Sequence, residues 1–201
     1  MGDISVVKEF LEAKGEANAT CPATHMSILS YACGKLEMTS DERAKRDEKR
    51  VDVLRILINA KADINLRSGW RGFSPLHECS RFNWIAGVLC ICKARADLEL
   101  ADIREGQTAL ILASCFGHAE TLTILLHHGA SIHATDHMRQ TPLHKAAKFD
   151  WPRAAEVLME AKSNLRAKDH GGFTPLEVAE RAGSNSAGRN MHNHQNQVPK
   201  C

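Results

Sequence analysis

Apolar residues recur along this chain in pairs of short helical patterns that are separated by turn segments. In the middle of the chain, Thr108–Ala113 begins a first apolar helix and Phe116–His118 interrupts it. Leu122, Leu125 and Leu126 then form the apolar stripe of a second helix, because residues three and four apart lie on one helix face. We therefore predict a hairpin of two antiparallel helices, followed by a turn.

The tripeptide that opens this hairpin returns at a nearly constant spacing of 34, 33 and 33 residues. Its copies are Ser74–Leu76, Thr108–Leu110, Thr141–Leu143 and Thr174–Leu176. A unit this short cannot bury an apolar face alone, so neighbouring copies must stack into a solenoid, which offers a long surface instead of an enclosed catalytic pocket. The predicted fold class is all-α, a solenoid of stacked helix-turn-helix units with protruding turns.

The predicted helix ends carry residues that suit them. Thr or Ser at the head of each unit supplies an N-cap oxygen, and Pro follows in three of the four clear units. Between the two helices, Asn83, Gly117 and Asp150 share one register, and these residues best tolerate the left-handed conformation that closes a helix. Pro152 then fits the first turn of the next helix.

Four segments match a known repeat motif. Thr141–Ala147 reads Thr-Pro-Leu-His-Lys-Ala-Ala, Ser74–Cys79 is close to it, and Ala62–Asn65 and Ala96–Leu98 match its unit-ending turn. In these segments the chain resembles the ankyrin-repeat family, whose signature is a 33-residue period with T-P-L-H-x-A. The resemblance covers roughly residues 3–183, with five heads in register, and it implies an ankyrin-repeat solenoid.

Individual positions follow or depart from the family pattern. His77 and His144 belong to the motif, and the resemblance implies that they fix the turn by hydrogen bonding rather than by any chemistry. Ile111 and Glu177 stand where the other units have His, and Arg139 stands where a turn glycine is expected.

The organisation that we predict begins and ends on half units. Ser27–Ala32 is a degenerate head, and the surplus residues of its unit include Thr39 and Glu42, which are spaced as a capping box. We expect this charged insertion to extend the second helix at its amino end, with a docking site as the alternative. The predicted segments are a half repeat (1–19), a degenerate repeat (20–68) with the insertion (35–50), three repeats (69–102, 103–136 and 137–169), a half repeat (170–183) and a disordered tail (184–201).

Candidate partner-binding residues lie at the ends of the first helices and at the turn tips. Phe82, Phe116 and Phe149 share one register, which in ankyrin repeats borders the concave face. They could anchor a partner or could cover the helix-helix turn.

The turn tips carry Trp and Arg, which are typical interface anchors, with a solvated loop as the alternative. The predicted contact residues are Trp70, Arg71, Phe73, Arg81, Phe82, Arg104, Glu105, Gln107, Phe116, Met138, Gln140, Lys148 and Phe149. Trp84 and Trp151 share a register that favours structural packing.

Composition and charge narrow the partners and the compartment. The 201 residues include 26 basic and 24 acidic ones, and the formal charge of +2 is too small to drive nucleic-acid binding. We expect no membrane association, because no apolar run approaches the roughly 18 residues of a membrane helix and the amino end resembles no signal peptide. Seven cysteines, an odd number, favour free thiols and a cytosolic or nuclear location.

Motifs for catalysis or metal binding do not stand out. Cys90 and Cys92 are about 200° apart around a helix, so they cannot hold one ion together. We predict a non-enzymatic protein-interaction module that binds an unidentified protein on the concave face and turn tips, needs no cofactor, and is monomeric alone. The alternatives are a metal- or redox-responsive protein that uses the free cysteines and the His-rich turn (His127, His128, His133 and His137), or the recognition module of a larger enzyme complex.

Overall fold

The computed structural model describes residues 16–34 and 43–197 of the chain, and the chain divides into two compact units, Met1–Arg104 and Glu105–Cys201. The described residues form ten helices and no strand, apart from two isolated β-bridges, Thr20 to Ser27 and Ser68 to Phe73. The all-α prediction is therefore confirmed.

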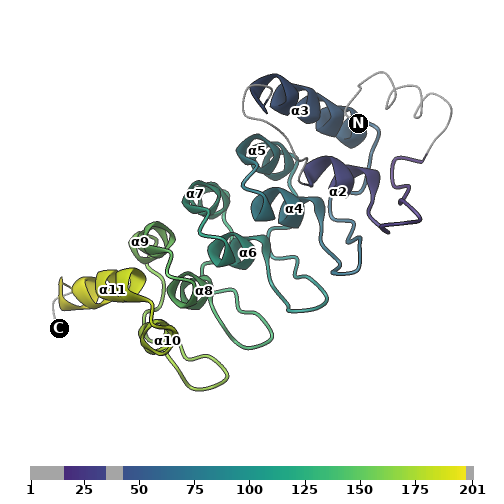
Figure 1. Cartoon of the computed structure of the whole chain (residues 1–201). Coiled ribbons are helices and arrows are strands. Elements are labelled where there is room, and N and C mark those ends of the chain that lie inside the picture. Colours follow the sequence, from purple (N-terminus) through teal and green to yellow (C-terminus); the bar gives the residue numbers. More distant parts are fainter. Residues whose placement is uncertain (1–15, 35–42, 198–201) are drawn as a thin grey trace. The chain divides into compact units, whose positions relative to one another are not determined.

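Unit 1 is built from two layers of helices (Figure 1). Its helices are α2 (Ile28–Cys33), α3 (Arg43–Asn59), α4 (Pro75–Arg81) and α5 (Ile85–Lys93). The first helices of its hairpins, α2 and α4, pack against each other, and so do the second helices α3 and α5. Each hairpin is completed by the pairs α2 with α3 and α4 with α5.

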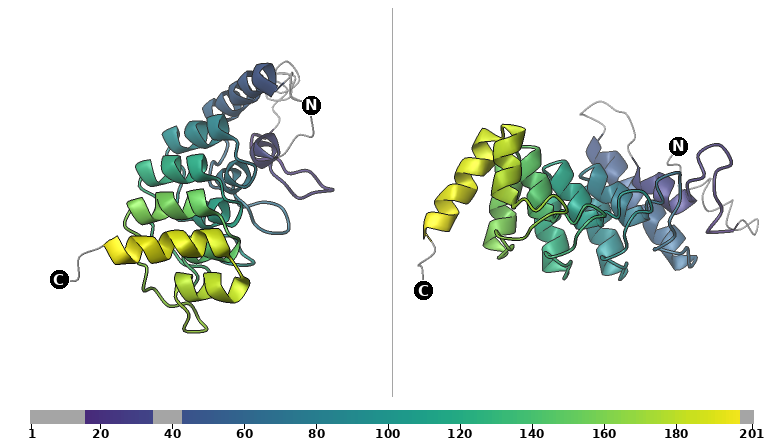
Figure 2. Two further views of the ribbon diagram at one scale, coloured as in Figure 1. Left: turned by 60° about the vertical axis from the view of Figure 1, so that its left-hand side comes forward. Right: turned by 90° about the horizontal axis from the view of Figure 1, so that it is seen from below.

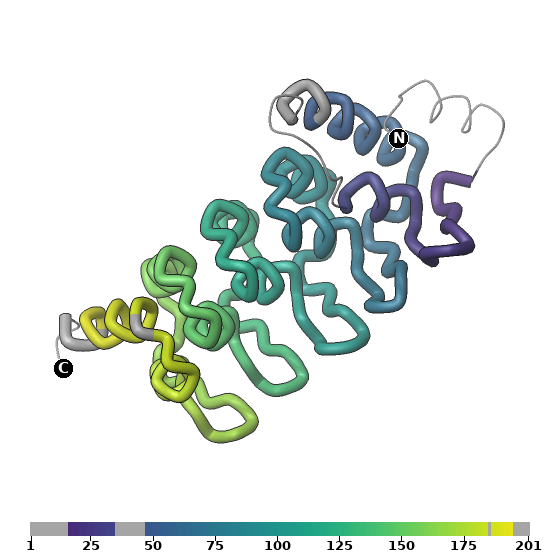
Figure 3. The backbone as a smooth tube through the Cα atoms, in the orientation of Figure 1, coloured from purple at the N-terminus to yellow at the C-terminus, as the bar shows by residue number. Residues whose placement is uncertain are grey.

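Unit 2 repeats the same arrangement with three hairpins (Figures 1 and 2). Its helices are α6 (Ala109–Cys115), α7 (Ala119–His127), α8 (Pro142–Lys148), α9 (Pro152–Glu160), α10 (Pro175–Ala182) and α11 (Asn185–Gln197). The first helix α8 packs between α6 and α10, and the second helix α9 packs between α7 and α11. The tube in Figure 3 shows the long turns that project from the first-helix layer.

The helix ends are capped as the sequence predicts. Thr108 and Thr141 accept hydrogen bonds from the backbone N–H three residues on, at 3.4 Å each. The Thr141 N–H donates in return to Nδ1 of His144 at 3.1 Å, and the Thr174 N–H donates to the Glu177 carboxylate at 2.7 Å. Glu177 thus performs the capping role of the His that it replaces, and such caps stabilise a helix by about 1 kcal/mol each.

The left-handed positions are also where the sequence places them. Asn83, Gly117 and Asp150 have φ of 51°, 71° and 54°. Arg139 has φ of 58°, a left-handed conformation that is strained for a residue with a side chain. The turn therefore keeps its geometry without the expected glycine. A glycine is needed at position 117 for a second reason, because a Cβ there would meet Cδ2 of Trp151 at 2.4 Å.

The charged insertion continues into a long second helix, as predicted. Helix α3 has 17 residues, whereas α5 has nine. Within it, Arg50 donates to the carbonyl oxygens of Ala32 (3.0 Å) and Gly34 (2.8 Å), and its guanidinium lies 3.8 Å from the ring centre of Trp84. The carboxyl end of the insertion therefore supports the end of α2. The predicted half repeat up to residue 15, and the predicted capping box of Thr39 and Glu42, lie outside the described residues.

The predicted disordered tail is wrong for residues 185–197, which form helix α11. Ala187 and Met191, one turn apart, are fully buried. The Asp150 carboxylate accepts hydrogen bonds from the backbone N–H groups of Ser186 (3.0 Å) and Ala187 (2.7 Å) at the start of the helix. The tail therefore supplies the second helix of the last hairpin, which closes the stack of unit 2.

Candidate protein-interaction surface

The turns of unit 2 are held by carboxylates at their bases. Oδ1 of Asp136 accepts hydrogen bonds from the N–H groups of Met138 (2.9 Å) and Gln140 (2.8 Å). One repeat further on, Oδ1 of Asp169 accepts from Gly171 (2.9 Å) and Phe173 (3.0 Å). Although partial burial opposes the shift, hydrogen bonds from the Gln140 side chain and from these two N–H groups lower the pKa of Asp169. The tips therefore have a fixed shape before any partner arrives.

Neighbouring turns are also joined to each other by backbone hydrogen bonds. In unit 1 the N–H of Ile103 donates to the carbonyl of Arg71 at 3.2 Å. In unit 2 the N–H of His137 donates to Glu105 and that of His170 donates to Met138, both at 2.9 Å. The tips of each unit therefore form a connected row. Because a connected row loses little conformational freedom on binding, it is suited to tight contact.

A buried ion pair connects one of these turns to the helix behind it. Nζ of Lys145, in α8, lies 2.6 Å from Oδ2 of Asp136, and the two residues are 7% and 6% exposed. Such a pair is costly to break, because either partner alone would be left as a buried charge.

The large apolar side chains that are exposed occupy corresponding positions in the hairpins of the two units. They are Tyr31 (39%), Trp70 (68%), Ile103 (59%), Phe116 (43%), Met138 (57%), Phe149 (48%) and Trp151 (41%). They lie in turn tips, on a first helix, or at the junction between the two helices. Among the described side chains, none lies within the second helices. We call the tips (69–73, 103–107 and 137–140) and the first-helix ends (Phe82, Phe116 and Phe149) the turn side.

Most of the predicted contact residues are accessible. Exposed residues are Trp70, Arg104, Glu105, Phe116, Met138, Lys148 and Phe149, and partly exposed ones are Arg71, Arg81, Phe82 and Gln140. Phe116 and Phe149 are the C-caps of α6 and α8, which pack against each other in unit 2, and Phe82 is the C-cap of α4 in unit 1. A stripe that joins all three stays a prediction.

Two predicted contact residues are buried. Phe73 is 2% exposed and stacks on His77, with ring centres 5.5 Å apart. Gln107 is 3% exposed, and its Nε2 donates to the carboxylate of Glu105 at 3.0 Å. Both residues directly precede an N-cap, where the chain turns inward onto the first helix, so neither side chain is presented to a partner.

Sequence reasoning missed Ile103, which is 59% exposed at a tip. An apolar residue next to Arg104, outside any helical period, was the available signal. Trp84 and Trp151 behave as structural residues. Trp84 is 5% exposed, while Nε1 of Trp151 donates to the carbonyl of Cys115 at 3.0 Å.

Arginines and aromatic rings alternate on the turn side of unit 1. The guanidinium carbons of Arg71 and Arg104 lie 4.9 Å and 4.8 Å from the ring centre of Trp70. Arg81 lies 5.0 Å from the ring centre of Phe82. Cation–π contacts of this kind hold both the ring and the charge in place.

The described thiols differ in their surroundings. Cys21 is exposed, and its side-chain hydrogen bond with Thr24 lowers its pKa, whereas other thiols are shielded from solvent. Burial raises the pKa of Cys92 and of Cys115 to about 11, and burial with the adjacent Cys33 thiol raises that of Cys79. These thiols stay protonated at neutral pH and are poor nucleophiles. In the described part of the chain, no group of three or more His, Cys, Asp or Glu side chains is placed to hold a metal ion.

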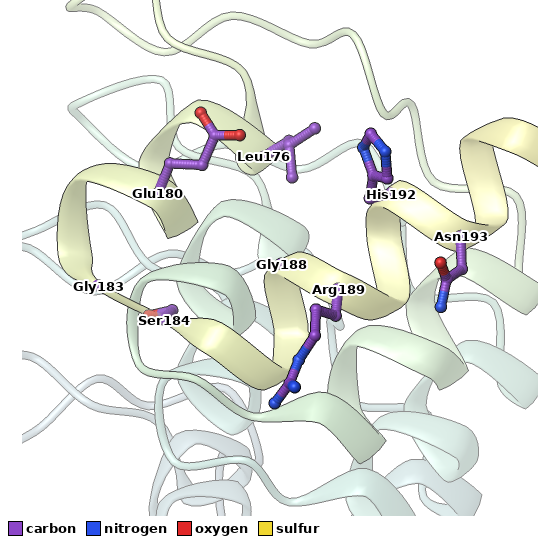
Figure 4. A pocket seen from close by; sticks show the side chains of 8 residues that line it. All are labelled: Leu176, Glu180, Gly183, Ser184, Gly188, Arg189, His192 and Asn193. Atoms are coloured by element: carbon purple, nitrogen blue, oxygen red, sulfur yellow. The ribbon is translucent and has the colours of Figure 1, made fainter.

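The hollows of unit 2 are small. One of about 270 Å³ lies between α10 and α11 (Figure 4), below the roughly 300–1,000 Å³ typical of ligand pockets. It is lined by Leu176, Glu180, Gly183, Ser184, Gly188, Arg189, His192 and Asn193. Another, of about 320 Å³, is lined by Ile132, His133, Thr135, Arg139, Thr141, Asn164, Ala167 and Lys168. In the described residues no helix has both the length and the hydropathy to cross a membrane.

Stacked helical hairpins with connected, projecting turns define a helical repeat scaffold. A family model described as ankyrin repeats (3 copies) matches residues 43–136. The chain therefore contains ankyrin repeats over residues 43–136.

The similar proteins are larger than this chain. A putative ankyrin repeat protein, FPV031, of Fowlpox virus (strain NVSL) is 33% identical over 135 residues, which are 64% of this chain and 40% of that protein. Ankyrin repeat and SOCS box protein 16 of Homo sapiens is 29% identical over 136 residues, 64% of this chain and 30% of that protein. Alpha-latrotoxin-Lhe1a of Latrodectus hesperus is 37% identical over 82 residues, 40% of this chain and 6% of that protein. The chain thus spans less than half the length of each of these relatives.

Proposed function

We propose that this chain is a non-enzymatic protein-interaction module that binds its partner with the turn side. Ankyrin repeats are in general protein–protein interaction modules. The observation that carries the proposal for this chain is that exposed apolar side chains lie in the tips or at the first-helix ends of each unit, such as Trp70 (68%) in unit 1 and Phe116 (43%) in unit 2. Exposed apolar groups that gather on the surface of a protein mark an interaction site.

The support of the turn side is as important as its composition. Tips that are joined by backbone hydrogen bonds and anchored by Asp136 and Asp169 hold their side chains in place. Aromatic side chains on such a rigid support can supply much of the free energy of binding, since little order has to be gained on contact.

The test compares matched variants of the full chain in pull-downs that are quantified by mass spectrometry. Trp70→Ala with Phe116→Ala removes one anchor from each unit. Lys93→Ala with Thr123→Ala removes two exposed side chains from the second helices α5 and α7. We expect the first pair to lose the specific partners and the second pair to keep them. A partner set that survives the first pair and disappears with the second would exclude the turn side.

A further inference from the structure

The tip of residues 69–73 differs from an ordinary apolar anchor because two cations lie beside the indole of Trp70. Arg71 and Arg104 place their guanidinium groups 4.9 Å and 4.8 Å from the ring centre of Trp70, and the indole is still 68% exposed. The two arginines come from consecutive turns, which are joined by the hydrogen bond from the N–H of Ile103 to the carbonyl of Arg71. The backbone hydrogen bond therefore holds the two turns together, and the cation–π contacts place both charges beside the ring.

A guanidinium that lies on a ring face keeps the hydrogen-bond donors in its own plane for other partners. Among the ion pairs of the described residues, those of Arg50, Arg55 and Lys145 involve neither Arg71 nor Arg104. The fork of donors on each guanidinium matches the two oxygens of a carboxylate.

Two of the three acidic residues beside this cluster are buried away from the surface. Glu78 is 6% exposed and Asp102 is 3% exposed. Burial raises the pKa of Glu78, while the charges of Arg81 and Arg71 oppose the rise, so this carboxyl is less readily ionised than an exposed one. The next residue along the chain, Glu105, accepts a hydrogen bond from Nε2 of Gln107. Arg71 and Arg104 therefore place two cations beside the exposed Trp70 ring, and Glu105 is their one exposed acidic neighbour among Glu78, Asp102 and Glu105.

From this geometry we infer that the partner presents an acidic peptide segment to this tip. Its carboxylates pair with Arg71 and Arg104, and an apolar side chain between them packs on Trp70. This inference rests on the proposed function, and it adds the chemistry of the partner. Charge complementarity of this kind steers association and selects among partners.

Single-stranded nucleic acid would also offer negative charge and stacking, but the chain as a whole does not favour it. The formal net charge is +2, and the cluster holds few cations. Non-specific nucleic-acid binding needs a groove of cations that follows the phosphate backbone. An acidic peptide needs only the two guanidinium groups and the indole ring.

The experiment pans a phage library of random peptides, about 12 residues long, against the full chain at low salt, where such charge pairs are least screened. Selected peptides are then synthesised with a fluorescent label and titrated by anisotropy. We expect them to carry two or more Asp or Glu residues around a Leu or an aromatic residue. We also expect their affinity to fall as salt is added.

Matched variants decide which groups are responsible. Arg71→Gln with Arg104→Gln should weaken the selected peptides about 30-fold, since two charge-assisted hydrogen-bonded pairs are lost. Arg71→Lys with Arg104→Lys should recover only part of this loss, because Lys keeps the charge without the fork. The control Arg153→Gln, an exposed arginine of α9, should change the affinity less than about twofold. Melting curves by circular dichroism verify that each variant is folded.

Neutral or basic selected peptides would overturn the inference, as would a double Gln variant that binds within about threefold of wild type. Tighter, arginine-dependent binding of an oligothymidine than of any selected peptide would also overturn it. If neutral peptides are lost on Trp70→Ala, the proposed function stands while the acidic preference fails. If no peptide is enriched, or if bound peptides respond to neither Trp70→Ala nor the arginine variants, both the proposed function and the acidic preference fail.

Discussion

The first and second helices of the hairpins differ in length, in burial and in capping. The first helices α4, α6 and α8 have seven residues each, six of which are buried, and each starts at a Ser or Thr N-cap. The second helices α5, α7 and α9 have nine residues each, of which three or four are buried, and their N-cap residues make no side-chain cap. A first helix has almost no exposed flank, so it can offer only its end and the turn before it to a partner.

The difference explains where the exposed apolar residues lie. A second helix needs apolar residues only along its buried stripe, and its exposed positions are polar, as Glu120, Thr123 and His127 are in α7. The ends and turns of the first helices are not required for that packing, so large apolar residues such as Trp70 and Met138 there contribute little to stability. Exposed apolar residues without a packing role are candidates for binding.

The largest expected effect tests how firmly a first helix is tied to its turn. Lys145→Met leaves the Asp136 carboxylate buried without its cation, so we expect the free energy of unfolding in urea to fall by about 3 kcal/mol. Lys148→Met, on the exposed part of the same helix, should change it by less than about 0.5 kcal/mol. Equal effects of the two substitutions would show that the ion pair does not hold the turn.

The next-largest expected effect tests whether α11, the second helix of the last hairpin, packs against its neighbours. Met191→Ala in α11 removes a fully buried side chain and should cost about 2–4 kcal/mol in the same urea assay. His192→Ala, its exposed neighbour, serves as the control. If Met191→Ala were as mild as His192→Ala, helix α11 would not be part of the stack in solution.

The capping imidazole of α8 gives a pH-dependent test. Burial lowers the pKa of His144, although its hydrogen bond to the Phe173 carbonyl and the nearby Asp169 and Asp136 oppose the shift. The unfolded chain therefore binds the proton more readily. The stabilisation is complete above the unfolded pKa of about 6.5 and is lost as pH falls toward the folded pKa. Wild type should lose more stability between pH 7 and pH 5 than His144→Gln, and equal losses would refute the assignment.

The smallest effect concerns the strained turn residue. Arg139→Gly relieves a side chain from φ of 58° and should stabilise the fold by about 0.5–1 kcal/mol. Arg55→Gly, at an exposed position within α3, should instead destabilise it by about 1 kcal/mol. Thermal melts can compare the signs of the two changes, and a destabilising Arg139→Gly would mean that the arginine has a packing role.

Local rules account for what could be predicted from the sequence. The capping Thr141, the left-handed Asn83 and the apolar stripe around Leu125 each act within a few residues of the chain, and the structure confirms all three. The exposure of Trp70 and Phe116 is predictable because their registers serve no helix stripe.

The features that were missed depend on residues far apart in the sequence. The polar helix α11 has only a short apolar stripe, Ala187 and Met191, and it is held at its start by Asp150 and along its length by the bond from Asn190 to Glu156 (2.8 Å). The burial of Phe73 likewise depends on packing around the turn. Periodicity alone carries no information on such contacts.

The most direct test of the turn side is an NMR titration of the labelled full chain with the tightest selected peptide. The account predicts that the largest amide shift changes fall on the turn side, at Trp70, Phe116 and Phe149 and in the adjoining tips. If the largest shift changes fell on the second helices α5, α7 and α9, with the tips unperturbed, the turn side would not be the binding surface.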